Sequence, residues 1–557
     1  MPTPPPRLLH LLGQASRART AAEFAVASRF PAATQRAKLR AILRANAHTA
    51  FGRAHGFASI RGPADFARRV PIMRPDDLQP WVERMMQGER DLITAETPVA
   101  YVTTTGSTGP AKYIPITPSY RAEFQKTVHV AVWHLFLRFP EAFTGRVLYF
   151  VGSRRVKTAP DGLDIGAMSG FNFTEMPAVV RAAYAWPYEL FEVPHLPTRT
   201  WLALHLAVIR DVTLIAGVFP APIVYLLRAL EREAPRLAWH VRQGTLPDDL
   251  TLTPEQRSFF AAMLEPRPDV ADRLARIESE PARAVELALP KLRLTYCWMT
   301  STAGLFVPEL QQRLGPDVPV RDAIYAACEG WCSIPMGEAE PGGALAVTSH
   351  FFEFLPVAAL EAGHLDDVRT VEQLEDGQQY FILVTNSAGM YRYLLGDIVE
   401  VCGFHHATPR IRFVRKVGAA SDLVGEKLEE SHVTAAVGAA LQTYGLRATW
   451  FTLVPITDRA ELGYDLYLEL ASPADRSRVA AFEADLDDVL RQHAAGYNFC
   501  RSGGLLTPVR TLHLAAGSYD AWRQQAVAGG AAEAQLKTAH LVAGPEKVPA
   551  RLRPGPR

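Results

Sequence analysis

Residues 103–112 read Thr-Thr-Thr-Gly-Ser-Thr-Gly-Pro-Ala-Lys, and the interpretation of the whole chain begins there. Glycine lets a backbone adopt positive φ and approach phosphate oxygens closely, and consecutive backbone N–H groups form an anion-binding nest. The spacing does not fit a Walker A loop. The segment therefore predicts a phosphate-binding loop, and the alternative is a simple Thr/Gly turn. The candidate nucleotide-binding residues in it are Thr104, Thr105, Gly106, Ser107, Thr108 and Lys112.

An aspartate at the start of a strand is the second candidate. Residues 391–397 read Tyr-Arg-Tyr-Leu-Leu-Gly-Asp, between predicted strands at 380–385 and 398–402. An acidic residue at such a place can accept hydrogen bonds from two ribose hydroxyls, as in dinucleotide-binding folds. We predict that Asp397 binds a ribose and that Arg392 belongs to the same nucleotide site. The alternative is a β-turn with a surface arginine.

Residues 325–329, which read Tyr-Ala-Ala-Cys-Glu, form the third segment. Tyr325 could stack on adenine. Glu329 could act in catalysis by holding Mg²⁺ beside the phosphates, because that ion prefers hard oxygen ligands. Alone, this segment is a weak indication of a nucleotide site.

Two lysines in the last third of the chain, Lys427 and Lys537, are the remaining catalytic candidates. Either could bring positive charge to an α-phosphate as pyrophosphate leaves. An isolated lysine is more often a solvated surface residue.

Length, charge and cysteine content exclude several classes of protein. The chain has 557 residues, so at least two domains are expected. Its formal net charge of +1 argues against a nucleic-acid partner and gives no electrostatic reason to bind a membrane. The most apolar stretch, 201–227, is interrupted by Arg210 and Asp211 and is predicted to be a buried core helix. Five scattered cysteines fit a reducing cytoplasm.

The pattern along the chain predicts an α/β protein. Residues 1–95 are expected to be mostly helical, and residues 292–401 alternate short apolar strands with loops and helices. After a flexible stretch at 415–427 we expect a small α+β domain. Its predicted helices lie at 429–443, 474–495 and 519–529, and its strands at 448–456, 463–470 and 508–515.

The order of the motifs is that of the adenylate-forming superfamily, and residues 104–112 fit its T-[ST]-G-[ST]-T-G-x-x-K pattern. Within that superfamily the sequence resembles the auxin-responsive (Gretchen Hagen) family of acyl acid–amido synthetases, whose plant members conjugate jasmonate, auxin or benzoates to amino acids. The resemblance runs from about Arg40 to His540. Its other motifs are residues 42–46, 49–53, 65–66, 70–72, 352–356, 388–393, 425–430, 517–519 and 535–537.

The chain departs from the family at three places. The plant loop is usually Ser-Ser-Gly-Thr-Ser-Gly-Gly, the usual Ser-Ser before Glu329 is absent from Ala326-Ala327-Cys328, and residues 419–425 differ. We expect a bacterial-type member whose nucleotide site is intact but whose acyl and acceptor sites cannot be inherited from the plant enzymes.

The resemblance implies a fold with two parts. A large N-terminal domain, 1–417, is expected to hold β-sheets and barrel-like parts flanked by helices. A hinge at 418–427 joins it to a small mobile α+β lid domain, 428–545, and a tail follows at 546–557.

The resemblance also implies an ATP- and Mg²⁺-dependent cytoplasmic ligase, expected to be monomeric. It would adenylate a small carboxylic acid and transfer the acyl group to an amino acid or amine, with a different lid position for each step. Two alternatives remain: a thiol acceptor such as coenzyme A, and a non-catalytic homologue that binds the acyl nucleotide without turnover. Residues 124–133 and 299–303 are candidate walls of the acyl pocket.

Overall fold

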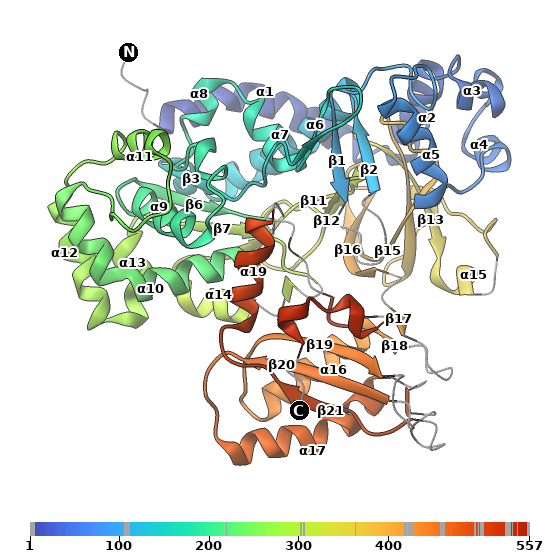
Figure 1. The fold of residues 1–557 in the computed structure, drawn as a ribbon. Helices are drawn as coiled ribbons and strands as arrows, with labels where there is room; N and C mark the ends of the chain where they lie inside the picture. Colours follow the sequence, from blue (N-terminus) through green and yellow to red (C-terminus); the bar gives the residue numbers. More distant parts are fainter. Residues whose placement is uncertain are drawn as a thin grey trace. The chain divides into compact units, whose positions relative to one another are not determined.

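The computed structural model describes residues 6–104, 112–218, 220–300, 303–304, 307–361, 364–416, 420–421, 428–456, 463–494, 497–498, 501, 506–529, 536, 539–542 and 544–553. The described residues up to Val414 form one compact unit, and those from Arg415 onward form a second (Figure 1). The two are described separately below.

The first unit begins with a layer of helices that pack on a six-stranded sheet. Proline at the first helical position starts several of them, where its missing N–H costs no hydrogen bond. Its helices are α1 (Pro6–Ala27), α2 (Pro31–Ala45), α3 (Ala50–Ala54), α4 (Pro63–Arg69) and α5 (Pro75–Met86). Residues 6–86 are thus mostly helical, as predicted for residues 1–95, and one continuous hydrophobic core joins these helices to the sheet.

The six-stranded sheet has the order β11-β12-β16-β15-β14-β13. Strands β13, β14 and β15 form an antiparallel meander in which Phe351 pairs with Thr385 and Gln379 pairs with Glu400. The elements are β11 (Ser333–Ile334), β12 (Gly343–Leu345), β13 (Phe351–Pro356), α15 (Val357–Glu361), β14 (Gln379–Thr385), β15 (Tyr393–His405) and β16 (Thr408–Lys416).

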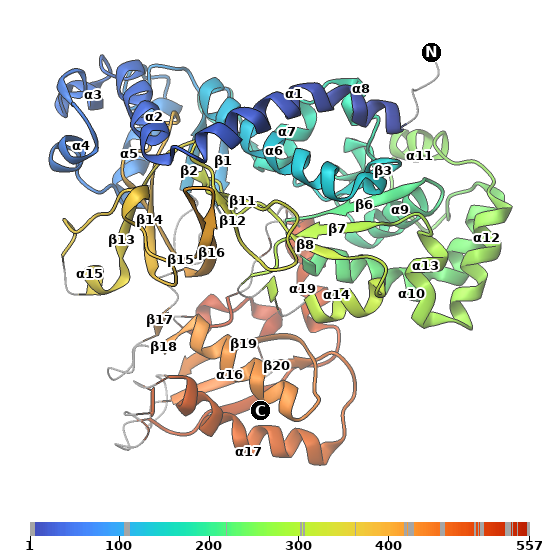
Figure 2. The same cartoon turned by 180° about the vertical axis from the view of Figure 1, so that it is seen from behind.

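A second, smaller sheet of the first unit has the order β2-β1-β5-β4. Strands β1 (Ala100–Thr104) and β2 (Lys112–Ile116) are an antiparallel hairpin, so residues 105–111 connect its two strands. Strands β4 (Lys157–Thr158) and β5 (Asp164–Gly166) complete the sheet, and helix α6 (Pro118–Arg138) follows β2, as predicted. Helix α6 lies along α1, as both views show (Figure 1 and Figure 2).

The third sheet is parallel, with the order β3-β6-β7-β8, and helices cover it. Its strands are β3 (Arg146–Tyr149), β6 (Val212–Ala216), β7 (Leu294–Cys297) and β8 (Val320–Asp322). The surrounding helices are α7 (Met168–Thr174), α8 (Ala178–Arg181), α9 (Leu196–Val208), α10 (Pro220–Gln243), α11 (Pro254–Ala261), α12 (Pro268–Ala275), α13 (Ala284–Ala288) and α14 (Val307–Leu314).

The apolar stretch at 201–227 corrects one sequence prediction. It is divided among the end of α9, strand β6 and the start of α10, so it is not a single core helix. Arg210 and Asp211 stand where α9 ends and β6 begins, which explains the interruption in the pattern. Among the residues that the structure describes, no helix is long and apolar enough to span a membrane.

The second unit contains a three-stranded sheet that shares one core with two helices, α16 (Glu430–Thr443) and α17 (Arg476–His493). Strand β19 (Ala448–Ile456) is antiparallel to β20 (Gly463–Leu470), and β21 (Arg510–His513) is parallel to β20. Its other elements are β17 (Ala420–Ser421), β18 (Leu428–Glu429) and α19 (Ser518–Ala528). The predicted order of helices and strands is observed, and the mixed α/β class is confirmed.

Arg392 ties the meander to the N-terminal helices. The residue is 4% exposed. Its guanidinium lies 3.1 Å from both carboxylate oxygens of Glu353 and donates to the carbonyl oxygens of Ala67 and Val70 at 2.8 Å. Its backbone is left-handed, with φ of 48°, which is uncommon for a residue other than glycine. The buried ion pair therefore joins β13 and the start of β15 to the end of α4.

We expect Arg392→Met to lower the free energy of unfolding by about 3–5 kcal/mol, because it leaves a buried carboxylate without its cation. Burial already raises the pKa of Glu353, against the opposing effect of Arg392. Loss of the arginine raises that pKa further. A carboxyl whose folded pKa exceeds its unfolded pKa contributes stability at low pH that is lost as the pH rises. The deficit relative to the unsubstituted protein should therefore be larger at pH 8 than at pH 5 in urea titrations.

Arg369→Met is the matched control. It removes an ion pair with Asp367 in which both side chains are 41% exposed, and such pairs contribute about 1 kcal/mol or less. Equal losses in the two variants would contradict the role given to the Arg392–Glu353 pair.

Candidate active site

Tyr325 and Asp397, predicted separately as parts of a nucleotide site, are in direct contact. The Tyr325 hydroxyl donates to Oδ2 of Asp397 at 2.7 Å. Tyr325 is 4% exposed and Asp397 is 5% exposed. Burial raises the pKa of the Tyr325 phenol well above its usual range, and the charge of Asp397 adds to the effect. The tyrosine is therefore a neutral donor that fixes one carboxylate oxygen.

The ring of Tyr325 packs in an aromatic group. Trp298 stacks on it at 6.4 Å between centroids, and Phe413 contacts it at 5.5 Å. These contacts hold the ring of Tyr325 in the orientation in which its hydroxyl reaches Asp397. The adenine stacking proposed from the sequence stays a prediction.

Glu329 lies in the turn of a short hairpin that starts beside Tyr325. Strand β9 (Ala326–Ala327) pairs with β10 (Gly330–Trp331), so Cys328 and Glu329 form the turn. The Tyr120 hydroxyl donates to the carbonyl oxygen of Cys328, and Nδ2 of Asn386 donates to that of Glu329, both at 2.7 Å. The backbone of the turn is thus held from α6 and from the β14–β15 connection, while the Glu329 side chain is partly exposed.

Asp397 and Glu329 act electrostatically on the same neighbours. Burial raises the pKa of the Cys332 thiol, and the two carboxylates raise it further. Both also contribute to a raised pKa of Tyr393, where burial is again the larger cause. The two carboxylates therefore lie in one region of the first unit.

The donor set fits Mg²⁺ shared with a substrate. In the described part of the chain, no group of three or more His, Cys, Asp or Glu could hold a metal ion. Mg²⁺ at phosphate sites is usually bound by one or two carboxylates together with the phosphates themselves. The partly exposed Glu329 has the carboxylate that such binding needs, and its binding to Mg²⁺ stays a prediction.

The predicted phosphate loop connects the strands of the β1–β2 hairpin. Thr104 and Lys112 are the last backbone pair of that hairpin. Thr105, Gly106, Ser107 and Thr108 lie outside the described residues. Lys427 and Lys537 also lie outside them, so their proximity to a phosphate stays a prediction.

Arg392 precedes Asp397 by five positions but has different contacts. The described hydrogen bonds of its side chain go to Glu353 and to backbone carbonyls of the α4 region. The structure thus gives it a place in the core, and the nucleotide role predicted for it is untested.

The parallel sheet ends next to these residues. Cys297 of β7 pairs with Asp322 of β8, and Tyr325 follows three positions later. Ligands of open α/β sheets bind at the carboxyl ends of the strands. Asp322 accepts from the backbone N–H groups of Met299 and Gly342 at 2.9 Å each, and burial raises its pKa to about 6 against the effect of these bonds.

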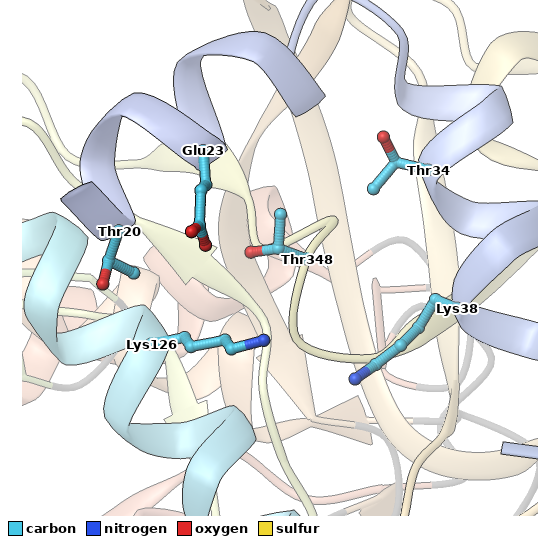
Figure 3. Close-up of a pocket in the computed structure, with 6 residues that line it drawn as sticks. All are labelled: Thr20, Glu23, Thr34, Lys38, Lys126 and Thr348. Carbon is cyan, nitrogen blue, oxygen red and sulfur yellow. The ribbon is translucent and has the colours of Figure 1, made fainter. Parts of the chain in front are cut away.

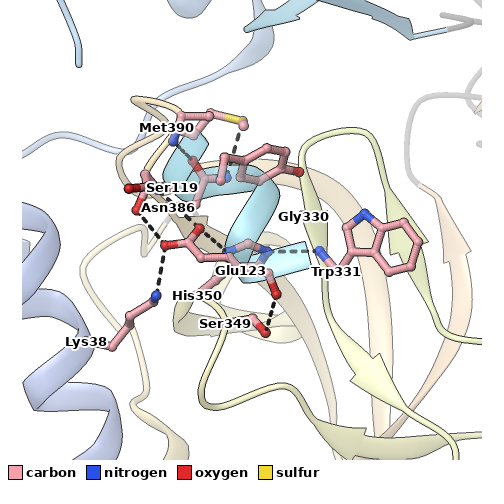
Figure 4. A network of polar contacts seen from close by, with 12 residues as sticks. Lys38, Ser119, Glu123, Gly330, Trp331, Ser349, His350, Asn386 and Met390 are labelled. Carbon is pink, nitrogen blue, oxygen red and sulfur yellow. Dashed lines mark hydrogen bonds and ion pairs between the residues drawn. The ribbon is translucent and has the colours of Figure 1, made fainter. Parts of the chain in front are cut away.

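Sequence reasoning missed the polar network behind the hairpin (Figure 4). It centres on Glu123 of α6, which contacts Lys38, His350 and Ser387. The available signal was one charged residue on an otherwise apolar face of a predicted helix. Its partners are far away in the sequence, so no spacing rule would have found them.

Three domain models of one protein family together match nearly the whole chain. The sequence profile of the GH3 family N-terminal domain matches residues 20–320, that of the GH3 family central domain matches 343–416, and that of the GH3 family C-terminal domain matches 431–546.

Individual proteins that are similar to this chain carry the same family name. The chain is 26% identical over 551 residues to the indole-3-acetic acid-amido synthetase GH3.8 of Oryza sativa subsp. indica, covering 92% of this chain and 88% of that protein. It is 25% identical to the 4-substituted benzoates-glutamate ligase GH3.12 of Arabidopsis thaliana, with 86% and 87% coverage. In fold it is similar to AtGH3.15 acyl acid amido synthetase in complex with 2,4-DB, with a TM-score of 0.82, 19% identity and 96% and 95% coverage.

Tyr325→Phe should lower the free energy of unfolding by about 1.5–3 kcal/mol, the range for a hydrogen bond to a charged group. The buried Asp397 loses a donor that the phenylalanine ring cannot replace. Chemical denaturation with an unchanged m value measures the effect. Tyr113→Phe is the control, because the Tyr113 hydroxyl contacts only the exposed Lys157 among its described hydrogen bonds. Stability equal to that of the control would show that the Tyr325–Asp397 bond contributes nothing.

Proposed function

Because this chain belongs to the GH3 family, we propose that it adenylates a small carboxylic acid with ATP and transfers the acyl group to an amino acid or amine. The enzyme is an ATP-dependent ligase of the adenylate-forming type. The single observation that best supports the proposal is the Tyr325–Asp397 contact beside Glu329. It joins two sequence motifs that are 72 positions apart, and together they offer a fixed carboxylate for a ribose and a second carboxylate for a cation.

The first half-reaction joins the acid to AMP. An oxygen of the carboxylate attacks the α-phosphorus of ATP, the bond to the bridging oxygen of the β-phosphate breaks, and pyrophosphate leaves. In our proposal Asp397 accepts hydrogen bonds from the ribose hydroxyls, and the loop from Thr104 to Lys112 cradles the phosphates. Bound at Glu329, Mg²⁺ would neutralise phosphate charge. Lys427 or Lys537 would supply positive charge where it develops on the α-phosphate.

The second half-reaction makes the amide. The amine nitrogen attacks the carbonyl carbon of the acyl-AMP, AMP leaves with the electrons of the broken carbon–oxygen bond, and the nitrogen loses a proton. We propose that residues 428–545 act as a lid and 418–427 as its hinge, since a mixed anhydride must be shielded from water. The protein is proposed to act as a cytoplasmic monomer.

The acid is proposed to be a small carboxylic acid, and the relatives named for indole-3-acetic acid, benzoates and jasmonate give the first candidates to test. Its pocket would be lined by residues of α6 between Phe124 and Trp133 and by the segment after β7 from Met299 to Ala303. Phe124 packs edge-on against Trp331 of the hairpin at 4.0 Å, so the face of α6 that carries Phe124 lies against the hairpin of Glu329.

The products distinguish this function from the alternatives. With ATP, an active acid and an amino acid, the enzyme should form AMP and pyrophosphate and no ADP above background, because the bond cleaved lies between the α- and β-phosphates. Chromatography of the nucleotides measures this across indole, benzoic and fatty acids. Stoichiometric ADP would refute adenylation, and product formation with coenzyme A but not with amines would favour the thiol acceptor. Binding of the acid and ATP without any turnover would favour the non-catalytic homologue.

Asp397→Ala should raise the KM for ATP at least tenfold, since the lost charge-assisted bond is worth roughly 1.5–3 kcal/mol and about 1.4 kcal/mol corresponds to a factor of ten. Tyr325→Phe is the matched control. It breaks the same Tyr325–Asp397 bond but keeps the carboxylate, so its KM should rise much less. Steady-state kinetics on folded protein measure both. If Asp397→Ala leaves the KM for ATP unchanged, the aspartate is a structural residue only.

A further inference from the structure

Glu123 of α6 is a buried carboxylate that joins four separate segments of the first unit. It is 4% exposed. Its Oε1 accepts from Nζ of Lys38 on α2 at 2.8 Å and from the hydroxyl of Ser387. Its Oε2 lies 3.2 Å from Nδ1 of His350. Burial would raise the pKa of Glu123, but hydrogen bonds from His350 and Lys38 and the charge of Lys38 lower it below its usual value, so the group is ionised.

Lys38 provides the charge that balances Glu123. Its side chain is 16% exposed and borders a cavity of about 250 Å³ whose other lining residues are Thr20, Glu23, Thr34, Lys126 and Thr348 (Figure 3). The ammonium can therefore keep contact with water on the cavity side while it pairs with Glu123, which limits the desolvation penalty of the pair.

The hydrogen bonds of His350 determine its tautomer. Its ring is fully buried, and burial lowers its pKa. The backbone N–H of Trp331 points at Nε2 at 3.1 Å, and an N–H can only donate, so Nε2 must be the unprotonated acceptor. The proton of the neutral ring is then on Nδ1, where it is donated to Glu123. The ionised Glu123 thus selects the tautomer whose other nitrogen accepts from the β9–β10 hairpin.

The backbone around His350 is itself fixed. The Gln35 side chain of α2 donates to the carbonyl oxygens of Val347 and His350 and accepts from the N–H of Phe352, with distances of 2.7–2.8 Å. Tyr120 stacks on the imidazole at 5.6 Å. The ring therefore has little freedom to move away from Trp331.

The network reaches the hairpin at two places, one in its turn and one on β10. His350 accepts from the N–H of Trp331 on β10, and Asn386 donates to the carbonyl oxygen of Glu329 in the turn. Ser387, the neighbour of Asn386, donates its hydroxyl to Glu123. One buried carboxylate is consequently connected through two routes to the segment that starts with Tyr325 and contains Glu329.

We propose that His350 and Asn386 are positioning residues for the nucleotide site, and that Glu123 holds them so that they fix the hairpin of Glu329. The inference rests on the proposed function, since it concerns how Glu329 is presented to Mg·ATP. Neither residue touches a reacting atom. Their effect is on where the Glu329 carboxylate lies relative to the fixed Asp397.

Two substitutions of His350 separate its two hydrogen bonds. In His350→Asn the amide nitrogen can occupy the place of Nδ1 and still donate to Glu123, but nothing accepts from Trp331. In His350→Gln the amide oxygen can reach the place of Nε2 and accept from Trp331. We expect His350→Asn to weaken Mg·ATP binding about tenfold, equivalent to about 1.4 kcal/mol, and His350→Gln to bind at least threefold more tightly than His350→Asn.

The readouts are the dissociation constant for Mg·ATP from calorimetry, the KM for ATP and kcat of acyl-AMP formation, and the melting temperature. Both substitutions remove a buried ring, so a purely structural role predicts equal effects on binding that follow the loss of stability. His205→Asn is the control, because it removes another fully buried imidazole, on α9 of the first unit. It should lower the melting temperature without changing ATP affinity.

Asn386→Ala tests the second connection, the hydrogen bond from Asn386 to the carbonyl oxygen of Glu329. It is the deciding test of the positioning role if the His350 variants do not fold. It should weaken Mg·ATP binding by a similar factor. ATP affinity equal to wild type in Asn386→Ala and His350→Asn, or equal losses in both His350 variants, would overturn the inference. A wild-type protein that binds Mg·ATP but forms no AMP refutes the proposed function, and the calorimetric comparison still tests the positioning role. A wild type that does not bind Mg·ATP overturns both.

Discussion

The negative charge of Glu123 inside the first unit is the constraint on which the arrangement of the candidate site depends. A buried carboxylate is costly unless it is paired and hydrogen-bonded, and this one has partners from α2, from the segment before β13 and from the β14–β15 connection. Because each partner comes from a different part of the chain, satisfying one charge brings these segments together at one point. The hairpin with Glu329 then rests on two of the same segments.

The Arg392–Glu353 pair performs the same task for another part of the first unit. It links β13 and β15 to the end of α4, while the Asp397 carboxylate a few positions later is bound by Tyr325. One short sequence motif thus serves two purposes. Its arginine holds the fold together, and its aspartate is presented, already oriented by a neutral tyrosine, at the site proposed for the ribose. This division explains why a motif can be compact in sequence although its side chains have partners far apart in space.

The described parts of the proposed nucleotide site all belong to the first unit, and the candidate lysines come from the last third of the chain. In the proposed mechanism the fixed carboxylates bind ATP in an arrangement that does not change between the half-reactions. Only the positive charge that assists departure of pyrophosphate, and the access of water or amine, would change with the lid. This division between fixed and changing groups suits the two-step reaction. The nucleotide is ATP, the substrate, in the first step, and its AMP part must stay bound until it leaves in the second step.

Patterns of residues close together in the sequence were enough to predict many of the helices and strands of this protein and the type of chemistry. The period of apolar residues predicted α6 and nearly every element of the second unit, and the order of the Thr/Gly loop, Tyr325, Glu329 and Asp397 indicated the chemistry. These features depend on residues close together along the chain, where hydrophobic period and turn chemistry act. The division of 201–227 into helix, strand and helix, the place of Arg392 in the core, and the network of Glu123, His350 and Asn386 were decided only by the tertiary structure. Glu123 and His350 are 227 positions apart. The partner of a buried charge depends on which segments the fold brings within hydrogen-bond distance. A local sequence pattern does not contain that information.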